Sequence, residues 1–199
     1  MSRPNWIVTL ALIAAVAAIV GCGDNRSPSS AGAQADGGAP PDGGPFHASS
    51  IAFVPDEGAP DGRIWLELEE ARPLENAFTL RVMGDGIDAY GVAGRLLFDT
   101  SVTTIVGATA GEALAGGDAE ILAAGAGNGK GGFFGVSRSL GERAAVPLTA
   151  DRVIGTLSFT VEGPGETRIR FNGVRSLVID AQAGAVTVGS RLGGTLIVK

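Results

Sequence analysis

The 199-residue chain contains one cysteine and one histidine, and both precede residue 49. Beyond Cys22 and His47 the chain therefore has neither a possible disulfide nor a zinc site built from histidine and cysteine ligands. Nucleophilic catalysis of the Ser-His-Asp or Cys-His type is excluded there as well. The chain also lacks a basic run: its formal net charge is −6 and its arginines are scattered. Nucleic acids and anionic membrane surfaces are consequently poor candidate partners.

The first 22 residues have the organisation of a secretion signal. Arg3 supplies a positive charge, and an uncharged apolar run, 6–20, follows it. This run is short for a membrane-spanning helix, so we predict a signal peptide over 1–21. The closing sequence Ile-Val-Gly-Cys resembles a bacterial lipobox. The resemblance implies cleavage after Gly21 and a membrane anchor in the form of lipid on Cys22. An ordinary signal peptide or an uncleaved anchor is the alternative interpretation.

Residues 22–48 are predicted to form a disordered linker. Gly, Ala, Pro, Ser and Asp dominate this segment, and such a composition buries too little apolar surface to offset the entropy of ordering. A flexible chain of this length spans roughly 25–30 Å on average, enough to hold a domain clear of a membrane. Gly23, rather than an aspartate, follows Cys22, which favours the outer over the inner membrane of a bacterial cell envelope. We interpret His47 as a solvated residue of this linker.

Residues 49–199 show the period-two pattern of β-strands. In 63–69, Ile64, Leu66 and Leu68 alternate with Trp65, Glu67 and Glu69. The segments 77–82, 153–161 and 167–171 alternate in the same way, and Val153, Leu157, Phe159 and Val161 are assigned to the core. Shorter strands are expected at 50–54, 91–98, 103–108, 119–123, 133–136, 177–179, 185–188 and 195–198. Glycine-rich turns separate these runs, so the pattern predicts an all-β fold of two antiparallel sheets. A short helical turn is the expectation for 137–150.

Two segments carry a family resemblance. In 88–102, Tyr90-Gly91-Val92 leads into a strand that ends in Phe98-Asp99. The later segment 151–161 places a small residue before an apolar-polar-Phe-polar-Val run. This order resembles that of cohesin domains over roughly 51–198. The resemblance implies a jelly-roll β-sandwich of about nine or more strands, shared by cohesins and some cellulose-binding modules. It also implies a partner protein of dockerin type.

Acidic residues offer the remaining chemistry, but in weak patterns. Glu67, Glu69 and Glu70 are close in sequence, as are Asp85, Asp88 and Asp99. A glycosidase needs two carboxyl groups at a defined separation across its substrate, and we interpret these acids instead as solvated or turn-forming. The spacing of Asp85 and Asp88 is not that of an EF-hand loop. The glycine-rich stretch 125–132 lacks Gly-Lys-Ser/Thr and is expected to be a mobile loop. We therefore predict no enzyme, no cofactor and no metal.

The candidate binding residues lie at outward positions of the predicted strands. A mixed polar and apolar set is typical of a protein-binding surface. An outward Trp65 could anchor a partner or stack on a sugar; the alternative is that it covers an edge or packs under a loop. We accordingly predict a non-enzymatic, lipid-anchored module that binds an extracellular or envelope protein, of dockerin type or other. The alternative is a polysaccharide-binding domain associated with polysaccharide degradation. The candidate face consists of Trp65, Glu67, Arg81, Leu97, Ile154 and Thr156.

Overall fold

The computed structural model describes residues 46–58, 62–114, 119–127, 129–139 and 144–199. The predicted signal peptide 1–21, the predicted lipidation site Cys22 and the linker up to residue 45 lie outside the described residues. No helix in the described part of the chain is long and apolar enough to cross a membrane.

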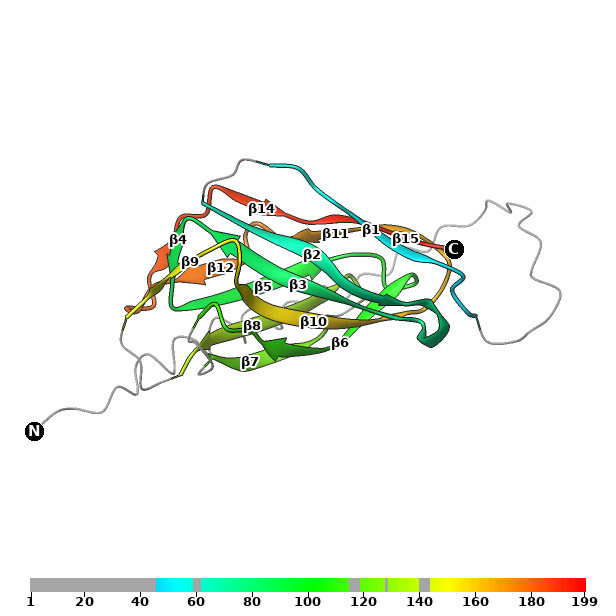
Figure 1. Ribbon diagram of the computed structural model, residues 1–199, viewed down its shortest axis with the longest axis horizontal. Helices are drawn as coiled ribbons and strands as arrows, with labels where there is room; N and C mark the ends of the chain where they lie inside the picture. The colour runs from blue at the N-terminus through cyan, green and yellow to red at the C-terminus, as the bar shows by residue number, and fades with distance from the viewer. Residues whose placement is uncertain (1–45, 59–61, 115–118, 128, 140–143) are drawn as a thin grey trace, which may run out of the picture.

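Two sheets packed face to face form the domain (Figure 1). The larger sheet has eight strands in the order β1-β15-β11-β5-β12-β13, with β8 on the other side of β5 and β7 beyond β8. Every strand pair in it is antiparallel. Its strands are β1 (Ile51–Pro55), β5 (Gly91–Leu97), β7 (Ala119–Ala126), β8 (Gly132–Arg138), β11 (Gly165–Phe171), β12 (Leu177–Ile179), β13 (Ala185–Val186) and β15 (Gly194–Val198).

The smaller sheet has five strands in the order β14-β2-β3-β10-β6. Its pairs are antiparallel except β14–β2, which is parallel. A short two-stranded ladder of β4 with β9 lies apart from both sheets. The all-β sandwich that the alternation predicts is thus confirmed. The strands are β2 (Arg63–Arg72), β3 (Ala77–Asp85), β4 (Ile87–Ala89), β6 (Thr103–Ala110), β9 (Val146–Leu148), β10 (Val153–Val161) and β14 (Ser190–Leu192), with a 3₁₀ turn η1 (Pro73–Glu75) between β2 and β3.

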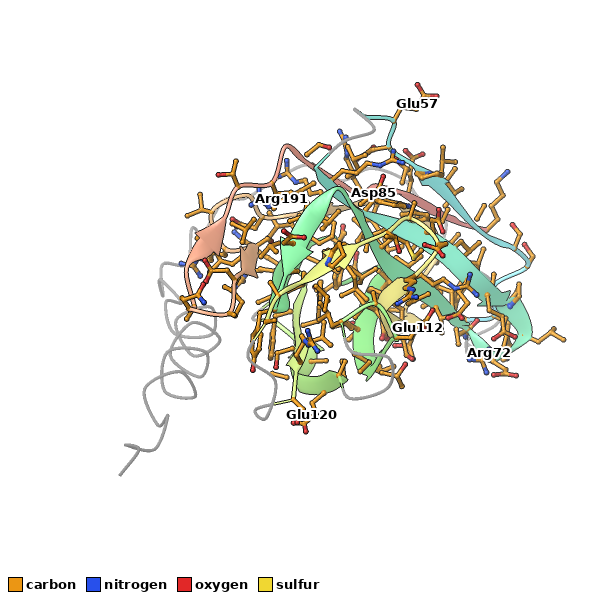
Figure 2. The ribbon with its side chains drawn as sticks, turned by 60° about the vertical axis from the view of Figure 1, so that its left-hand side comes forward. Glu57, Arg72, Asp85, Glu112, Glu120 and Arg191 are labelled. Atoms are coloured by element: carbon orange, nitrogen blue, oxygen red, sulfur yellow. The ribbon has the colours of Figure 1, made fainter. Side chains whose placement is uncertain are left out.

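The core lies between the two sheets and is built from the alternating apolar residues. Phe78, Leu80 and Val82 of β3 are fully buried. The rings of Phe78 and Phe159 stack with centroids 4.8 Å apart and planes 6° apart, an arrangement that adds to the area burial of both rings. Charged side chains such as Glu57 and Glu120 lie at the periphery, where they remain hydrated (Figure 2).

Glycine in β5 allows an aromatic ring to lie against the strand. Gly94 is paired with Phe134 of β8, and the Phe134 ring covers it. A Cβ atom at position 94 would lie 2.8 Å from Phe134 Cζ, well inside van der Waals contact. Close packing of the Phe134 ring against β5 therefore requires glycine at position 94.

A β-bulge corrects one part of the predicted alternation. The register of β10 against β3 shifts between Val153 and Gly155. Ile154 and Gly155 are therefore both buried, although consecutive residues of a regular strand point to opposite faces. Ile154 consequently enters the core with 0% exposure, whereas Val153 is only partly buried. The prediction that Ile154 faces outward is wrong for this reason.

Three further features differ from the sequence-based expectation. The segment 137–150, expected to hold a helical turn, contains strand β9 in its described part, whereas its residues 140–143 lie outside the described residues. The glycine-rich stretch 125–132, expected to be a loop, has only its two ends in strands β7 and β8, and between them the N–H of Gly127 donates to the carbonyl of Gly131. The packed region also starts before residue 49, because Phe46 contacts the core and Ala48 is buried.

The beginning and the end of the domain lie together. The N–H of Ser50 donates to the carbonyl of Lys199 at 3.2 Å, and the N–H of Lys199 donates to the carbonyl of Ser50 at 3.1 Å. Asn76, in a left-handed conformation with φ of 50°, fixes the entering chain. Its Nδ2 donates to the carbonyl of Phe46 at 2.6 Å, and its Oδ1 accepts from the N–H of Ala48 at 2.8 Å.

Candidate functional site

Three of the six predicted binding residues form one row on the outer face of the smaller sheet. Glu67 of β2 is opposite Arg81 of β3, and Arg81 is opposite Thr156 of β10. Arg81 is already engaged, because its Nη2 lies 3.2 Å from Glu69 Oε1. The sheet thus brings these three residues together, as the predicted face requires.

Trp65 lies on the outer side of the same sheet but is covered by its neighbours. The Arg63 guanidinium carbon lies 4.4 Å from the centroid of the ring, and Met83 is the cross-strand neighbour. The indole Nε1 donates to Glu67 Oε1 at 3.0 Å. Only 9% of Trp65 is exposed. The outward direction predicted for Trp65 is thus correct, but the ring is covered and does not present a stacking surface to a sugar.

The remaining two predicted residues do not belong to that surface. Ile154 is in the core because of the β10 bulge. Leu97 lies on β5, in the larger sheet, and points to the outer face of that sheet. The six residues therefore do not form one continuous face.

The rest of the outer face of the smaller sheet is rich in hydroxyl groups. Side chains of β3, β6 and β10 alternate between buried apolar residues and outward polar ones. The outward set on these strands includes Thr79, Thr104, Thr109, Thr156, Ser158 and Thr160. Threonine and serine rarely dominate the energy of protein interfaces. This face mainly offers hydrogen bonds, and its exposed large apolar side chain is Val106 of the edge strand β6, at 59% exposure.

The larger sheet presents a different outer face. Arg95 of β5 is opposite Phe133 of β8, and Leu97 is opposite Arg170 of β11. Leu97 and Phe133 are half-buried, whereas Arg168 and Arg170 are exposed. We call this surface the arginine face; it consists of Arg95, Leu97, Phe133, Arg168, Arg170 and Leu177. Alternation predicts Arg168 and Arg170 to point outward, but it does not show that β5 lies beside β11 and that β8 follows on the other side of β5.

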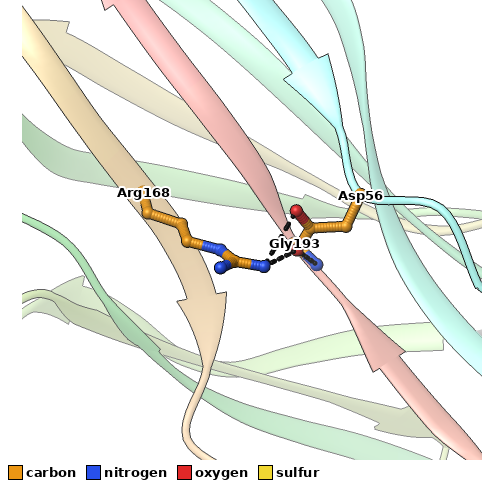
Figure 3. A network of polar contacts seen from close by, with 3 residues as sticks. All are labelled: Asp56, Arg168 and Gly193. Atoms are coloured by element: carbon orange, nitrogen blue, oxygen red, sulfur yellow. Dashed lines mark hydrogen bonds and ion pairs between the residues drawn. The ribbon is translucent and has the colours of Figure 1, made fainter.

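Arg168 helps to fasten the edge strand β1 to this sheet (Figure 3). Its Nη2 lies 3.1 Å from Asp56 Oδ1 and 3.0 Å from Asp56 Oδ2. The N–H of Gly193 also donates to Asp56 Oδ2, at 3.2 Å, and the N–H of Asp56 donates to the carbonyl of Gly193 at 3.0 Å. Gly193 is required at this point because a Cβ atom there would overlap the carbonyl of Ile169.

A hollow of about 400 Å³ opens at one end of the arginine face. Its polar lining contains more basic than acidic groups, and its apolar lining comes from the end of β5. The residues that line it are Leu97, Phe98, Asp99, Lys130, Thr167, Arg168 and Arg170.

Asp99 is the acidic group of this hollow, and hydrogen bonds to its carboxylate lower its pKa. The Ser101 hydroxyl and the Ser101 N–H donate to its Oδ1 at 2.7 and 2.8 Å, and these bonds lower the pKa of Asp99. Hydrogen bonds of this kind favour the charged form of a carboxyl group. The N–H of Asp99 in turn donates to Thr167 Oγ1 at 2.8 Å, which joins the end of β5 to β11.

The acidic residues considered for catalysis or metal binding serve structural roles or stand apart. Glu70 Oε2 lies 3.5 Å from Arg72 Nε, as Glu69 lies beside Arg81. Within the described residues, no three of the types His, Cys, Asp and Glu are grouped closely enough to hold a metal ion. His47 is exposed.

Comparisons with known proteins place the fold. No protein-family model matches the sequence, and no curated protein matches it. Among solved structures, the second type II cohesin module from an adaptor scaffoldin of Acetivibrio cellulolyticus has a TM-score of 0.52 at 12% identity, over 65% of this chain and 91% of that one. A type II cohesin domain from the cellulosome of the same organism has a TM-score of 0.51 at 14% identity, over 66% of this chain and 91% of that one.

A third similar structure is a complex. It is a type II cohesin-X-dockerin complex from Acetivibrio cellulolyticus, with a TM-score of 0.51 at 12% identity, over 65% of this chain and 93% of that chain. The described domain thus has a cohesin-like fold, as the resemblance in 88–102 and 151–161 implies.

Proposed function

We propose that this cohesin-like domain is a non-enzymatic docking module that binds a partner protein of dockerin type through its arginine face. Support for a protein partner comes from the fold, because one of the similar structures is a cohesin bound to a dockerin. Folds host many functions, so the choice of surface has to come from the residues of this chain.

The composition of the arginine face carries the proposal. Interface cores combine apolar and aromatic residues with arginine, and arginine is frequent among the residues that dominate binding energy. Leu97, Phe133 and Leu177 supply half-buried apolar area beside Arg95 and Arg170 on this face. The outer face of the smaller sheet instead offers mainly hydroxyl groups, and its exposed apolar side chain Val106 lies on the edge strand β6. The arginine face therefore matches a protein interface better.

Polysaccharide binding receives less support from the geometry. Recognition of a sugar ring by stacking needs an accessible aromatic face. Trp65 is the aromatic residue predicted for that role, and Arg63 and Met83 cover it. The experiment described below distinguishes this alternative, because a polysaccharide-binding domain would be retained on insoluble polysaccharide.

We further propose that the domain is tethered by lipid on Cys22, outside a bacterial cell and at the outer membrane. The lipobox-like end of segment 1–21 and the composition of 22–48 support this placement. The chain enters the domain beside Lys199, at the start of β1, which is an edge strand. Attachment at an edge leaves both outer sheet faces accessible to a partner.

The test is affinity capture with the full chain in detergent against envelope and secreted extracts of the source organism. The variant Phe133→Asp places a charge in the middle of the arginine face, and Thr156→Asp places the same charge on the outer face of the smaller sheet. We expect a protein that the wild type and Thr156→Asp capture, and that Phe133→Asp loses by at least tenfold. Thermal unfolding of both variants verifies that they are folded.

Two results would contradict the proposal. Loss of the captured protein with Thr156→Asp, but not with Phe133→Asp, would move the interface to the smaller sheet. Retention on insoluble polysaccharide without any captured protein would favour the carbohydrate alternative.

A further inference from the structure

Charge is distributed unevenly over the domain. The chain as a whole has a formal net charge of −6. The strands of the larger sheet nevertheless carry more arginine than acid: Arg95, Arg138, Arg168 and Arg170 against Glu120 and Glu166. The basic groups on the arginine face therefore stand out from an otherwise acidic molecule, and such a local field steers a partner of opposite charge.

The hollow at the end of the arginine face concentrates this basic character. Lys130 of the β7–β8 turn and Arg170 of β11 both line it, and both are exposed. Neither side chain forms a hydrogen bond or an ion pair with any described residue. Arg168 differs, because Asp56 already balances its charge.

Asp99 does not neutralise the positive charges of Lys130 and Arg170. It is a single carboxylate facing two cations, and its Oδ1 is committed to Ser101. Lys130 and Arg170 thus leave an excess of positive charge in a hollow with an apolar side formed by Leu97 and Phe98.

We propose that this hollow receives a carboxylate side chain of the partner, so that the docking segment of the partner is acidic. The proposal rests on the proposed function and names the chemistry of its ligand. A guanidinium presents a planar fork that matches a carboxylate with two parallel hydrogen bonds. A volume of about 400 Å³ lies in the range of small binding pockets and holds a glutamate or aspartate side chain with its neighbouring backbone. Leu97 and Phe98 provide contact for the methylene groups of that side chain.

The direct test uses synthetic peptides and the full chain in detergent. A fluorescein-labelled twelve-residue peptide that alternates Glu with Leu is compared with the same peptide in which Gln replaces every Glu. Fluorescence anisotropy at 20 and 300 mM NaCl measures both affinities. We expect the Glu peptide to bind at least tenfold tighter than the Gln peptide at low salt, with most of this preference lost at high salt.

Variants that neutralise basic side chains locate the site. In Lys130→Gln/Arg170→Gln the preference for the Glu peptide falls at least tenfold. Arg152→Gln removes an exposed arginine that lines a different hollow and leaves the preference within twofold of the wild type. All the substituted residues are exposed, so thermal unfolding should not change.

Several outcomes would overturn the inference. Equal binding of the two peptides, or an equal effect of Arg152→Gln, would show that the hollow does not select carboxylates. Dimerisation of the wild type, lost in the double variant during sedimentation, would identify a second copy of this acidic chain as the occupant instead. A captured natural partner that Phe133→Asp loses and Lys130→Gln/Arg170→Gln retains would refute the inference and leave the proposed function intact.

Discussion

Asp99 shows how a single side chain holds together the end of β5 and the turn that follows it. Its carboxylate accepts hydrogen bonds from the N–H and the hydroxyl of Ser101, and its own N–H donates to the hydroxyl of Thr167 on β11. Because the pKa of Asp99 is lower in the folded chain than in an unfolded one, its ionised form favours folding. This contribution is present above the unfolded pKa and is lost as the pH falls through the folded pKa.

Substitution of Ser101 tests this relation. Ser101→Ala removes the larger of the two causes, the hydroxyl bond, and retains the backbone N–H. We expect the pKa of Asp99 to rise toward its ordinary value, as followed by carboxyl NMR titration. Ser158→Ala, on the outer face of the smaller sheet, is the control and leaves the titration unchanged. An unchanged pKa in Ser101→Ala would show that the backbone bond alone sets the shift.

Trp65 illustrates the limit of residue-level prediction. Alternation correctly assigns it to the outer side of β2. Its exposure depends on Met83, which lies on another strand, and on the conformation of the long Arg63 side chain. The local pattern of polar and apolar residues predicts neither of these two contacts. The sequence therefore indicates on which side of the sheet the Trp65 ring lies, but not that other side chains shield it from solvent.

At the scale of the strand, the period-two pattern predicts most elements, because a strand buried on one face must alternate. The predicted segments 63–69, 77–82, 153–161 and 167–171 are strands β2, β3, β10 and β11. A bulge is a local change of register against a partner strand, and the sequence of β10 alone does not reveal it. For the same reason the parallel pairing of β14 with β2, and the meeting of β5, β8 and β11 that forms the arginine face, could not be predicted.

Replacing a glycine by alanine is expected to have different effects on stability at two positions in the strands. A Cβ atom at Gly94 would collide with the Phe134 ring, whereas Gly107 of β6 has no atom within 4 Å of such a position. We expect Gly94→Ala to lower the free energy of unfolding by about 1–3 kcal/mol through overpacking. Gly107→Ala should be neutral, or should raise that free energy by about 0.5 kcal/mol, because it restricts the unfolded chain.

Urea denaturation of the two variants measures the contrast. Equal stability of Gly94→Ala and Gly107→Ala would mean that Phe134 moves aside without cost. The larger sheet would then be less tightly packed than its ring contacts suggest.

At the scale of the whole molecule, the proposed lipid anchor is open to a direct test. We expect the full chain, expressed in a bacterium, to incorporate a labelled palmitate analogue and to fractionate with membranes. Cys22→Ser should lose the label and most of the membrane-bound protein, because several acyl chains on one residue are what give stable attachment. Ser29→Ala is the control and keeps both. Membrane retention of unlabelled Cys22→Ser would indicate that the 1–21 segment remains as an uncleaved anchor.

The hydrogen bonds between Ser50 and Lys199 also bring the first and last strands of the domain side by side. A linker of a few residues from Lys199 to Phe46 would join the chain into a circle, and the turn at Val174, which is 88% exposed, offers a place to cut it open again. Tolerance of circular permutation is greatest where the termini meet and the new ends are exposed. The same geometry would let the whole sandwich be inserted into a surface loop of another protein, since its entry and exit occupy one spot.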